Sequence, residues 1–214
     1  MFFRPKPPAT FAIQIPMQST VSPRRAASYS PYLSAGTPPR SPRQPKERHP
    51  NADDYTFLFL ILVVPSWDQV RDGQRHLQEI NARIEEMRLE QKGGTFLYLT
   101  VLCYGAEVDW VFISQMPFQW EHLERRDLEL LPGCALRDAV GEALDHAVDL
   151  LESNRNRARV RSRIELWEAA QDTSSTYFVD DELKRLHRLA QSYPTFDGLL
   201  LPEGSSLAPL FFSK

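Results

Sequence analysis

The run from Tyr55 to Val64, YTFLFLILVV, is the feature that most limits the folds open to this chain. Apart from one threonine it contains only aromatic and aliphatic side chains, and it ends at Pro65. A strand with one face in water would alternate apolar and polar residues, so a continuous run predicts a strand covered on both faces. Such strands are typical of parallel sheets that carry helices on each side.

The segment after this run has apolar residues at helical spacing. After Pro65 and Ser66, apolar residues recur three and four positions apart until Gly93 and Gly94, which predicts an amphipathic helix closed by glycine. The apolar positions are Val70, Leu77, Ile80, Ile84 and Met87. Two further apolar segments, Thr95 to Tyr104 and Val108 to Ser114, are separated by a three-residue turn that contains glycine. They predict a β-hairpin.

The second half of the chain continues the alternation of helices and strands. An Ala-rich apolar stripe from Leu136 to Leu151 predicts a long helix. We expect a strand at Arg163 to Ala169, a helix at Asp180 to Gln191 and a last strand at Phe196 to Leu201. Leu183, Leu186 and Leu189 are expected to face inward from that helix. The predicted fold is a three-layer α/β domain with a mainly parallel sheet, an antiparallel edge hairpin and helices on both faces.

The first fifty residues differ in composition from the rest. They hold 11 of the 17 prolines and no acidic residue before Glu47, and their net charge is about +7. With few large apolar side chains they cannot offset the entropy of ordering. We therefore expect residues 1–50 to form a disordered, proline-rich basic tail before a domain at residues 51–214. The total charge of −3 leaves that domain at about −10, so binding to nucleic acid is not expected.

The chain is expected to be soluble and intracellular, cytoplasmic or nuclear. Its longest apolar run is far shorter than the roughly 20 residues of a membrane-spanning helix, so no membrane partner is expected. Cys103 and Cys134 form no CxxC pair and no disulfide framework, which favours a reducing compartment. An organelle import signal is the alternative for the tail, although four prolines before Met17 would break an import helix.

Two segments carry a resemblance to the von Willebrand factor A-type domain. ILVVPSWDQ, at the end of the first strand, and LPGCALRDAVGEALDHAVDLL, at the start of the Ala-rich helix, lie where that family has its two metal-binding loops. With the order of elements, the resemblance covers about Tyr55 to Leu210. It implies a scaffold for protein interaction whose loops, in the family, hold magnesium through an Asp-x-Ser-x-Ser motif, a threonine and a later aspartate.

This chain departs from the family's metal-ion-dependent adhesion site at several positions. Val64 stands where the first aspartate belongs, Asp68 replaces the second serine and Ala135 stands in place of the threonine. Ser66 matches the first serine, and Asp172 could match the last aspartate. Magnesium needs near-octahedral oxygen coordination, so the resemblance implies a degenerate site without tightly bound metal, with weak magnesium binding as the remaining option.

Three other features have two interpretations each. Cys134, after Gly133 and before a helix, has the setting of a reactive thiolate, but no spacing puts a base beside it, and His146 lies over three turns along the same helix. A structural role is therefore favoured. Alternate arginines from Arg155 to Arg163 suggest a phosphate-binding stripe or, as we favour, the solvated end of the Ala-rich helix. Trp67 is either a partner anchor or, more commonly, packed on the next helix.

The sequence therefore favours a protein-interaction module whose partner, another protein, it does not identify. The predicted contact rim consists of Ser66, Trp67, Asp68, Cys134 and Asp172. The alternative is a cysteine-dependent or weakly metal-dependent enzyme on the same domain. Walker-type, GxGxxG, HExxH and GxSxG motifs are absent from the sequence, so the common nucleotide-binding, zinc-protease and hydrolase classes lose support.

Magnesium is predicted to contribute little to stability. Ser66, Asp68 and Asp172 with three waters would hold the ion weakly. If the dissociation constant is millimolar or higher, 1 mM magnesium adds at most about 0.4 kcal/mol, a shift of about one or two degrees in melting temperature. Thermal unfolding with and without magnesium measures this. A clear rise that Asp68→Ala abolishes would contradict the prediction and indicate a working metal site.

Overall fold

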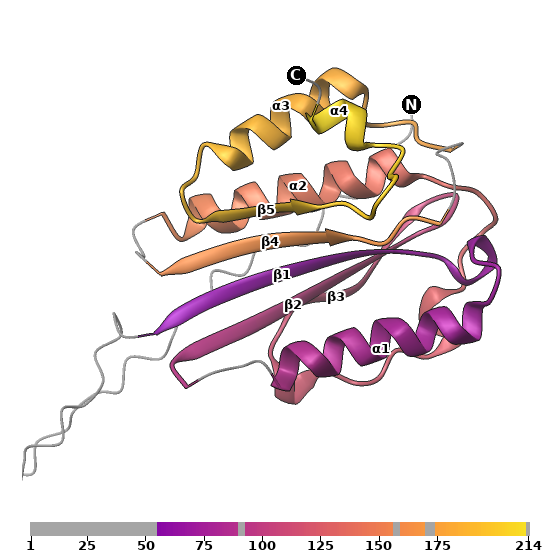
Figure 1. Cartoon of the computed structure of the whole chain (residues 1–214), viewed down its shortest axis with the longest axis horizontal. Coiled ribbons are helices and arrows are strands. Elements are labelled where there is room, and N and C mark those ends of the chain that lie inside the picture. Colours follow the sequence, from indigo (N-terminus) through magenta and orange to yellow (C-terminus); the bar gives the residue numbers. More distant parts are fainter. Residues whose placement is uncertain (1–54, 90–92, 156–158, 170–173, 213–214) are drawn as a thin grey trace, which may run out of the picture. The chain divides into compact units, whose positions relative to one another are not determined.

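The computed structural model of the chain describes residues 55–89, 93–155, 159–169 and 174–212, which form one five-stranded sheet with helices (Figure 1). The strand order is β3-β2-β1-β4-β5. The central strand β1 (Thr56–Pro65) pairs in parallel with β2 (Thr95–Tyr104) and β4 (Val160–Leu166). At the edges, β3 (Val108–Gln115) is antiparallel to β2 and β5 (Phe196–Leu200) is parallel to β4. The predicted α/β fold is confirmed, while the predicted tail at residues 1–50 lies outside the described residues.

The side chains of β1 enter two separate cores. From Leu60 to Val64 none is more than 1% exposed. Phe59, Ile61 and Val63 belong to one apolar cluster, whereas the residues between them belong to another. Because successive side chains of a strand point to opposite faces, each cluster fills one side of the sheet. The continuous apolar run is therefore explained by burial of β1 on both faces of the sheet, as its pattern predicted.

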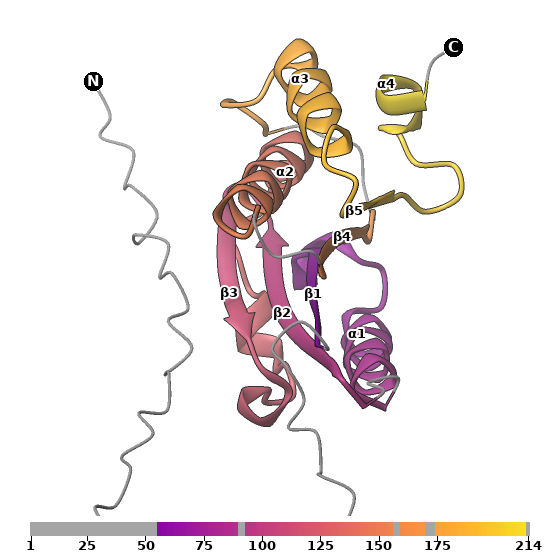
Figure 2. The same ribbon diagram turned by 90° about the vertical axis from the view of Figure 1, so that its left-hand side faces the viewer.

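Helices cover both faces of the sheet. Figure 2, which looks along the sheet, shows α1 (Gly73–Leu89) on one side and α2 (Leu136–Ser153) with α3 (Asp180–Gln191) on the other. The last helix, α4 (Ala208–Phe212), lies beside α3, where the ring of Phe211 is 4.8 Å from that of His187. In the described part of the chain, no helix is both long and apolar enough to cross a membrane.

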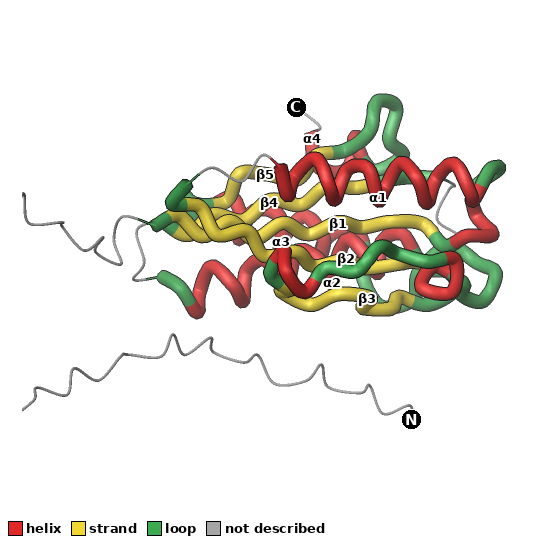
Figure 3. The backbone as a smooth tube through the Cα atoms, turned by 90° about the horizontal axis from the view of Figure 1, so that it is seen from below, coloured by secondary structure: helices red, strands yellow, loops and turns green. Residues whose placement is uncertain are grey.

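The segment after β3 shares the face of α1 (Figure 3). It contains two 3-10 turns, η3 (Pro117–Gln119) and η4 (Arg125–Leu128), and a third, η2 (Trp67–Gln69), precedes α1. The side-chain amide of Asn81 on α1 donates to the carbonyl of Leu123 and accepts its N–H, each at 2.9 Å. Leu123 is only 2% exposed. This loop therefore completes the second core instead of lying free on the surface.

Strand β4 begins earlier than predicted. It covers Val160–Leu166 instead of residues 163–169, so Arg161 and Arg163 belong to a strand. Their assignment to the solvated end of the preceding helix is wrong. Both project from one face, as alternate residues of a strand do. Both are also neutralised within the domain, because Arg161 pairs with Asp197 at 2.5 Å and Arg163 with Glu165 at 2.6 Å.

Helix α3 has the predicted bounds, but one of its predicted inward residues is wrong. Leu183 and Leu186 are buried, whereas Leu189 is 37% exposed. His187 is only 4% exposed and lies against the aromatic rings of α4. His187 is thus buried in place of Leu189 because α4 covers it. The helical pattern of the sequence does not show how α4 packs.

Leu144 lies in the middle of the buried stripe of α2 and is 0% exposed. Leu144→Ala is expected to lower the free energy of unfolding by about 2 to 5 kcal/mol, since the cavity adds to the lost transfer energy. Denaturant unfolding measures this. Leu189→Ala, on the exposed side of α3, is the matched control and should cost less than about 1 kcal/mol. Equal effects of the two variants would show that α2 does not anchor the core.

Candidate functional site

The parallel strands end together at one edge of the sheet, here called the carboxyl edge. It consists of segments 66–71, 131–135, 167–169 and 174–179. Backbone bonds connect the strand ends there, because the N–H of Ser66 donates to the carbonyl of Tyr104 and that of Trp167 to the carbonyl of Val63, each at 2.8 Å. In open α/β sheets this edge is where ligands bind.

Gln69 joins two of the loops at the carboxyl edge. Its side-chain N–H group donates to the carbonyl of Tyr104 at 3.0 Å and also to the carbonyl of Gly133. Its Oε1 atom is buried and has no hydrogen-bond partner among the described residues. The loop before α1 and the loop before α2 are therefore held against each other by one side chain.

The start of α2 is capped by residues from a distant loop. Its N-cap residue, Ala135, has no side chain that accepts a hydrogen bond. Instead, the hydroxyl of Ser174 accepts the N–H of Cys134 at 3.1 Å, and the hydroxyl of Ser175 accepts the N–H of Asp138 at 3.2 Å. Free N–H groups in the first turn of a helix need such acceptors. Here tertiary structure supplies them.

Asp138, in the first turn of α2, binds the backbone of the same loop. Its carboxylate is 3% exposed and accepts the backbone N–H groups of Thr176 at 2.8 Å, Tyr177 at 3.0 Å and Phe178 at 2.9 Å. Hydrogen bonds to an ionised acceptor are stronger than neutral ones. The position in the first turn of α2 also favours a negative charge. Asp138 therefore fixes the backbone of residues 176–178.

Two glycines allow the loop to approach α2 so closely. Gly133 has a φ of 150°, and a Cβ atom there would lie 2.7 Å from the hydroxyl of Ser174. A Cβ atom at Gly141, on α2, would overlap the ring of Phe178. Any other residue at these positions would push the loop away from the helix.

The structure separates the predicted rim residues by burial. Ser66 is 0% and Cys134 is 3% exposed, so these two predicted rim residues are buried in this structure. Asp68 is exposed. Trp67 is half-buried against Gly73, with the guanidinium of Arg125 5.0 Å from the ring centroid. Asp172 lies outside the described residues.

Neither candidate histidine lies beside Cys134. His146 contacts Thr100 in the middle of β2, with Nε2 3.4 Å from Oγ1, and its ring is edge-on to Trp110. Burial lowers the pKa of His146 to about 4. His122 is exposed, and its Nε2 lies 3.9 Å from a carboxylate oxygen of Glu85. Neither His146 nor His122 therefore forms a cysteine–histidine pair with Cys134.

A metal site requires several ligand side chains to lie close together. Within residues 55–212, excluding the three gaps, no three His, Cys, Asp or Glu side chains come close enough to hold an ion. The predicted set of Ser66, Asp68 and Asp172 includes a residue beyond these ranges. The Ser66 hydroxyl is buried without a hydrogen-bond partner in the described part of the chain.

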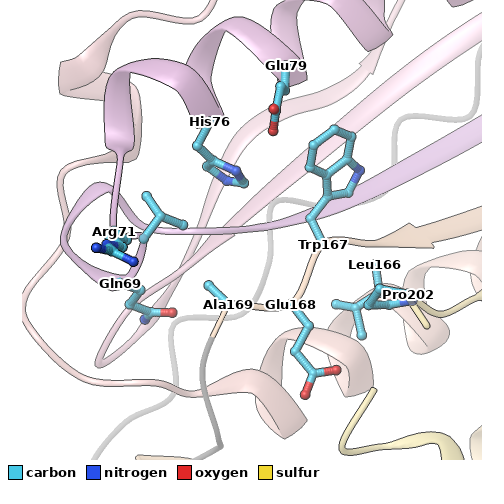
Figure 4. A pocket seen from close by; sticks show the side chains of 10 residues that line it. Gln69, Arg71, His76, Glu79, Leu166, Trp167, Glu168, Ala169 and Pro202 are labelled. Atoms are coloured by element: carbon cyan, nitrogen blue, oxygen red, sulfur yellow. The ribbon is translucent and has the colours of Figure 1, made fainter. Parts of the chain in front are cut away.

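A pocket of about 500 Å³ opens at the carboxyl edge between α1 and the segment after β4 (Figure 4). Gln69 and Arg71 reach it from the loop before α1, His76 and Glu79 from α1, and Trp167 and Glu168 from beyond β4. The rings of His76 and Trp167 meet edge to face, with centroids 5.7 Å apart. Burial lowers the pKa of His76. The sequence did not predict this pocket, because its lining residues come from three separate parts of the chain.

Three large apolar side chains at the carboxyl edge are exposed. Leu131 is 69%, Tyr177 is 64% and Val179 is 65% exposed. Leu131 lies in the segment before α2, where its carbonyl accepts the N–H of Ala106 at 2.9 Å, and Tyr177 and Val179 lie in the segment before α3. We call these three residues the apolar patch.

Comparison with known proteins gives only distant similarities. No protein-family model and no curated protein matches the chain. Among solved structures it is similar to the ArnB paralog VWA2 from Sulfolobus acidocaldarius, with 12% identity, a TM-score of 0.40 and coverage of 68% of this chain and 33% of that one. It is also similar to proximal thread matrix protein 1 from the mussel byssus, with 11% identity, a TM-score of 0.42 and coverage of 69% and 38%. The chain thus spans about a third of the length of each.

Asp138→Asn tests the link between α2 and the loop at residues 174–178. The amide loses the charge and turns one acceptor into a donor that faces backbone N–H groups, so the free energy of unfolding should fall by about 1.5 to 3 kcal/mol. Hydrogen exchange at residues 176–178 should also become faster. Asp145→Asn, at an exposed position of the same helix, is the control and should change neither. Unchanged exchange in the Asp138 variant would contradict the assigned role.

Proposed function

We propose that this domain is a protein-interaction module that binds another protein through its carboxyl edge. The observation that carries the proposal is the apolar patch of Leu131, Tyr177 and Val179, whose members are each more than 60% exposed. Contiguous exposed apolar surface marks interaction sites on folded domains, and in this proposal the three side chains contribute to one such surface. Tyrosine is also enriched among the residues that dominate binding energy.

Hydrogen bonds within the domain hold the backbone at Tyr177 and Val179. Tyr177 is held by Asp138, and Val179 is the N-cap residue of α3, whose carbonyl accepts the N–H groups of Glu182 and Leu183 at 3.0 Å. Ordering a loop costs free energy on association. A patch that is already ordered avoids this cost and offers a defined shape, as an interaction module requires.

Trp67 and Asp68 extend the proposed contact surface toward α1. Asp68 is exposed, and Trp67 lies under the guanidinium of Arg125. Gln69 connects their loop to the loop of Leu131 through the carbonyl of Gly133. In this proposal the module works without tightly bound metal, because apolar contact and hydrogen bonding supply the affinity.

The module is favoured over the cysteine-dependent or metal-dependent enzyme on geometric grounds. A nucleophilic cysteine needs access to substrate and a base within hydrogen-bond reach. Cys134 is 3% exposed, and the candidate histidines His146 and His122 contact other residues. The pocket at the carboxyl edge has His76 in its wall but does not include Cys134.

Quantitative affinity capture with the full chain tests the proposal. Proteins from an extract of the cells that make this chain are compared for the wild type and for a Tyr177→Ser, Val179→Ser double variant. The control is Phe118→Ser, which removes a 77% exposed aromatic residue beyond the end of β3, at the opposite edge of the sheet.

We expect specific partners to be reduced at least tenfold by the double variant and retained by the control, since removing two central contacts costs about 2 kcal/mol or more. Equal capture by all three proteins, with normal folding of each, would refute a role for the apolar patch.

A further inference from the structure

We propose that the pocket between α1 and the segment after β4, here called the edge pocket, receives a positively charged side chain, arginine or lysine, of the partner protein. This inference rests on the proposed function and names the chemistry that the partner presents. Six residues carry the argument: Gln69, Arg71, His76, Glu79, Trp167 and Glu168.

Two polar atoms of the residues that line the edge pocket are buried without a hydrogen-bond partner in the described part of the chain. The side-chain N–H group of Gln69 already donates to two carbonyls, so only its buried Oε1 atom lacks a hydrogen-bond partner among the described residues. Burial lowers the pKa of His76, and its Nε2 has no hydrogen-bond partner among the residues described. In a region of low dielectric an unpaired amide oxygen such as that of Gln69 acts strongly on a nearby charge.

Two of the lining residues are glutamates, and the Glu168 carboxylate points away from His76 and Trp167 (Figure 4). Glu79 projects from α1 on the side of Trp167 (Figure 4). Its ion pair with Arg75, at 2.8 Å, is largely exposed, with side chains 75% and 47% accessible. Exposed pairs of this kind contribute little, so Glu79 can exchange its partner. Glu168 accepts hydrogen bonds from Ser205 and Ser206, which are neutral, so its charge is not compensated there.

Trp167 provides a surface on which a cation can stack. Its indole is half-buried and lines the edge pocket beside His76. The face of an indole ring attracts a guanidinium or ammonium group, and arginine also stacks on it as a planar group. A volume of about 500 Å³ leaves room for such a side chain.

The same arrangement disfavours an anion. A carboxylate of the partner would face Glu79 and the electron-rich ring of Trp167. Arg71 is the cation among the lining residues, and it lies exposed in the loop before α1. The excess of about ten negative charges in residues 51–214 adds a long-range attraction for a basic partner. Charge complementarity therefore selects a basic segment.

Nuclear magnetic resonance of the full chain tests this with small probes. The indole N–H signals are followed during titration with N-acetyl-arginine amide and, separately, the lysine analogue. N-acetyl-citrulline amide, which has the shape of the arginine probe without its charge, is the matched control. Trp167→Phe identifies the signal of Trp167 among the four tryptophans.

The Trp167 signal should shift in a saturable way with the arginine or the lysine probe and by less than a tenth as much with citrulline at the same concentration. Glu79→Gln should weaken binding of the cationic probe about threefold to tenfold. Glu86→Gln, which removes a carboxylate paired with Arg83 on the same helix, should leave it unchanged. Equal shifts with arginine and citrulline, or equal binding by both variants, would overturn the proposal.

The probes need no partner protein, so this result is separate from the test of the module. Saturable, Glu79-dependent binding of the cationic probe supports the edge pocket even where variants of the apolar patch capture the same proteins as the wild type. If the Trp167 signal does not shift while the other three indole signals are dispersed as in a folded protein, the proposal that the edge pocket binds a cation is refuted. The role of the apolar patch is then tested by affinity capture alone.

Discussion

The burial of β1 on both faces is the constraint on which the rest of the structure depends. Five successive side chains from Leu60 to Val64 are at most 1% exposed, so the strand needs a helical layer on each side and a neighbouring strand at each edge. Parallel neighbours satisfy this, with α1 on one face and α2 on the other. Because parallel strands end at one edge, their loops must meet there. The candidate site is thus a consequence of how the central strand is buried.

The fold was largely predictable because its signals are local. Apolar runs and helical spacing depend on residues within a few positions of one another. The start of β4 was missed because Arg161 and Arg163 look like surface residues until Asp197, Glu165 and Arg83 are brought beside them. Leu189 was misplaced for a similar reason, since α4 covers His187 and not the leucine. In each case a tertiary contact decided the outcome against the local pattern.

The candidate site was much less predictable. Asp138 binds main-chain groups 38 to 40 residues away, and backbone N–H groups leave no mark in a sequence. The family resemblance directed attention to Ser66 and Cys134, which are buried, and to Asp68, which is exposed. The exposure of Tyr177 and Val179 could not be predicted from the sequence, because it depends on which side of their loop packs against α2. The edge pocket combines residues from three parts of the chain, so only the folded arrangement reveals it.

The central claim is that a partner protein contacts the carboxyl edge through the apolar patch and places a cationic side chain in the edge pocket. Hydrogen–deuterium exchange of the full chain, with and without a captured partner, tests it most directly. The account predicts slower exchange at residues 67–71, 131–134 and 174–179 in the complex. Protection confined to β3 and the turn after it, residues 108–119, with no change at the carboxyl edge, would contradict it.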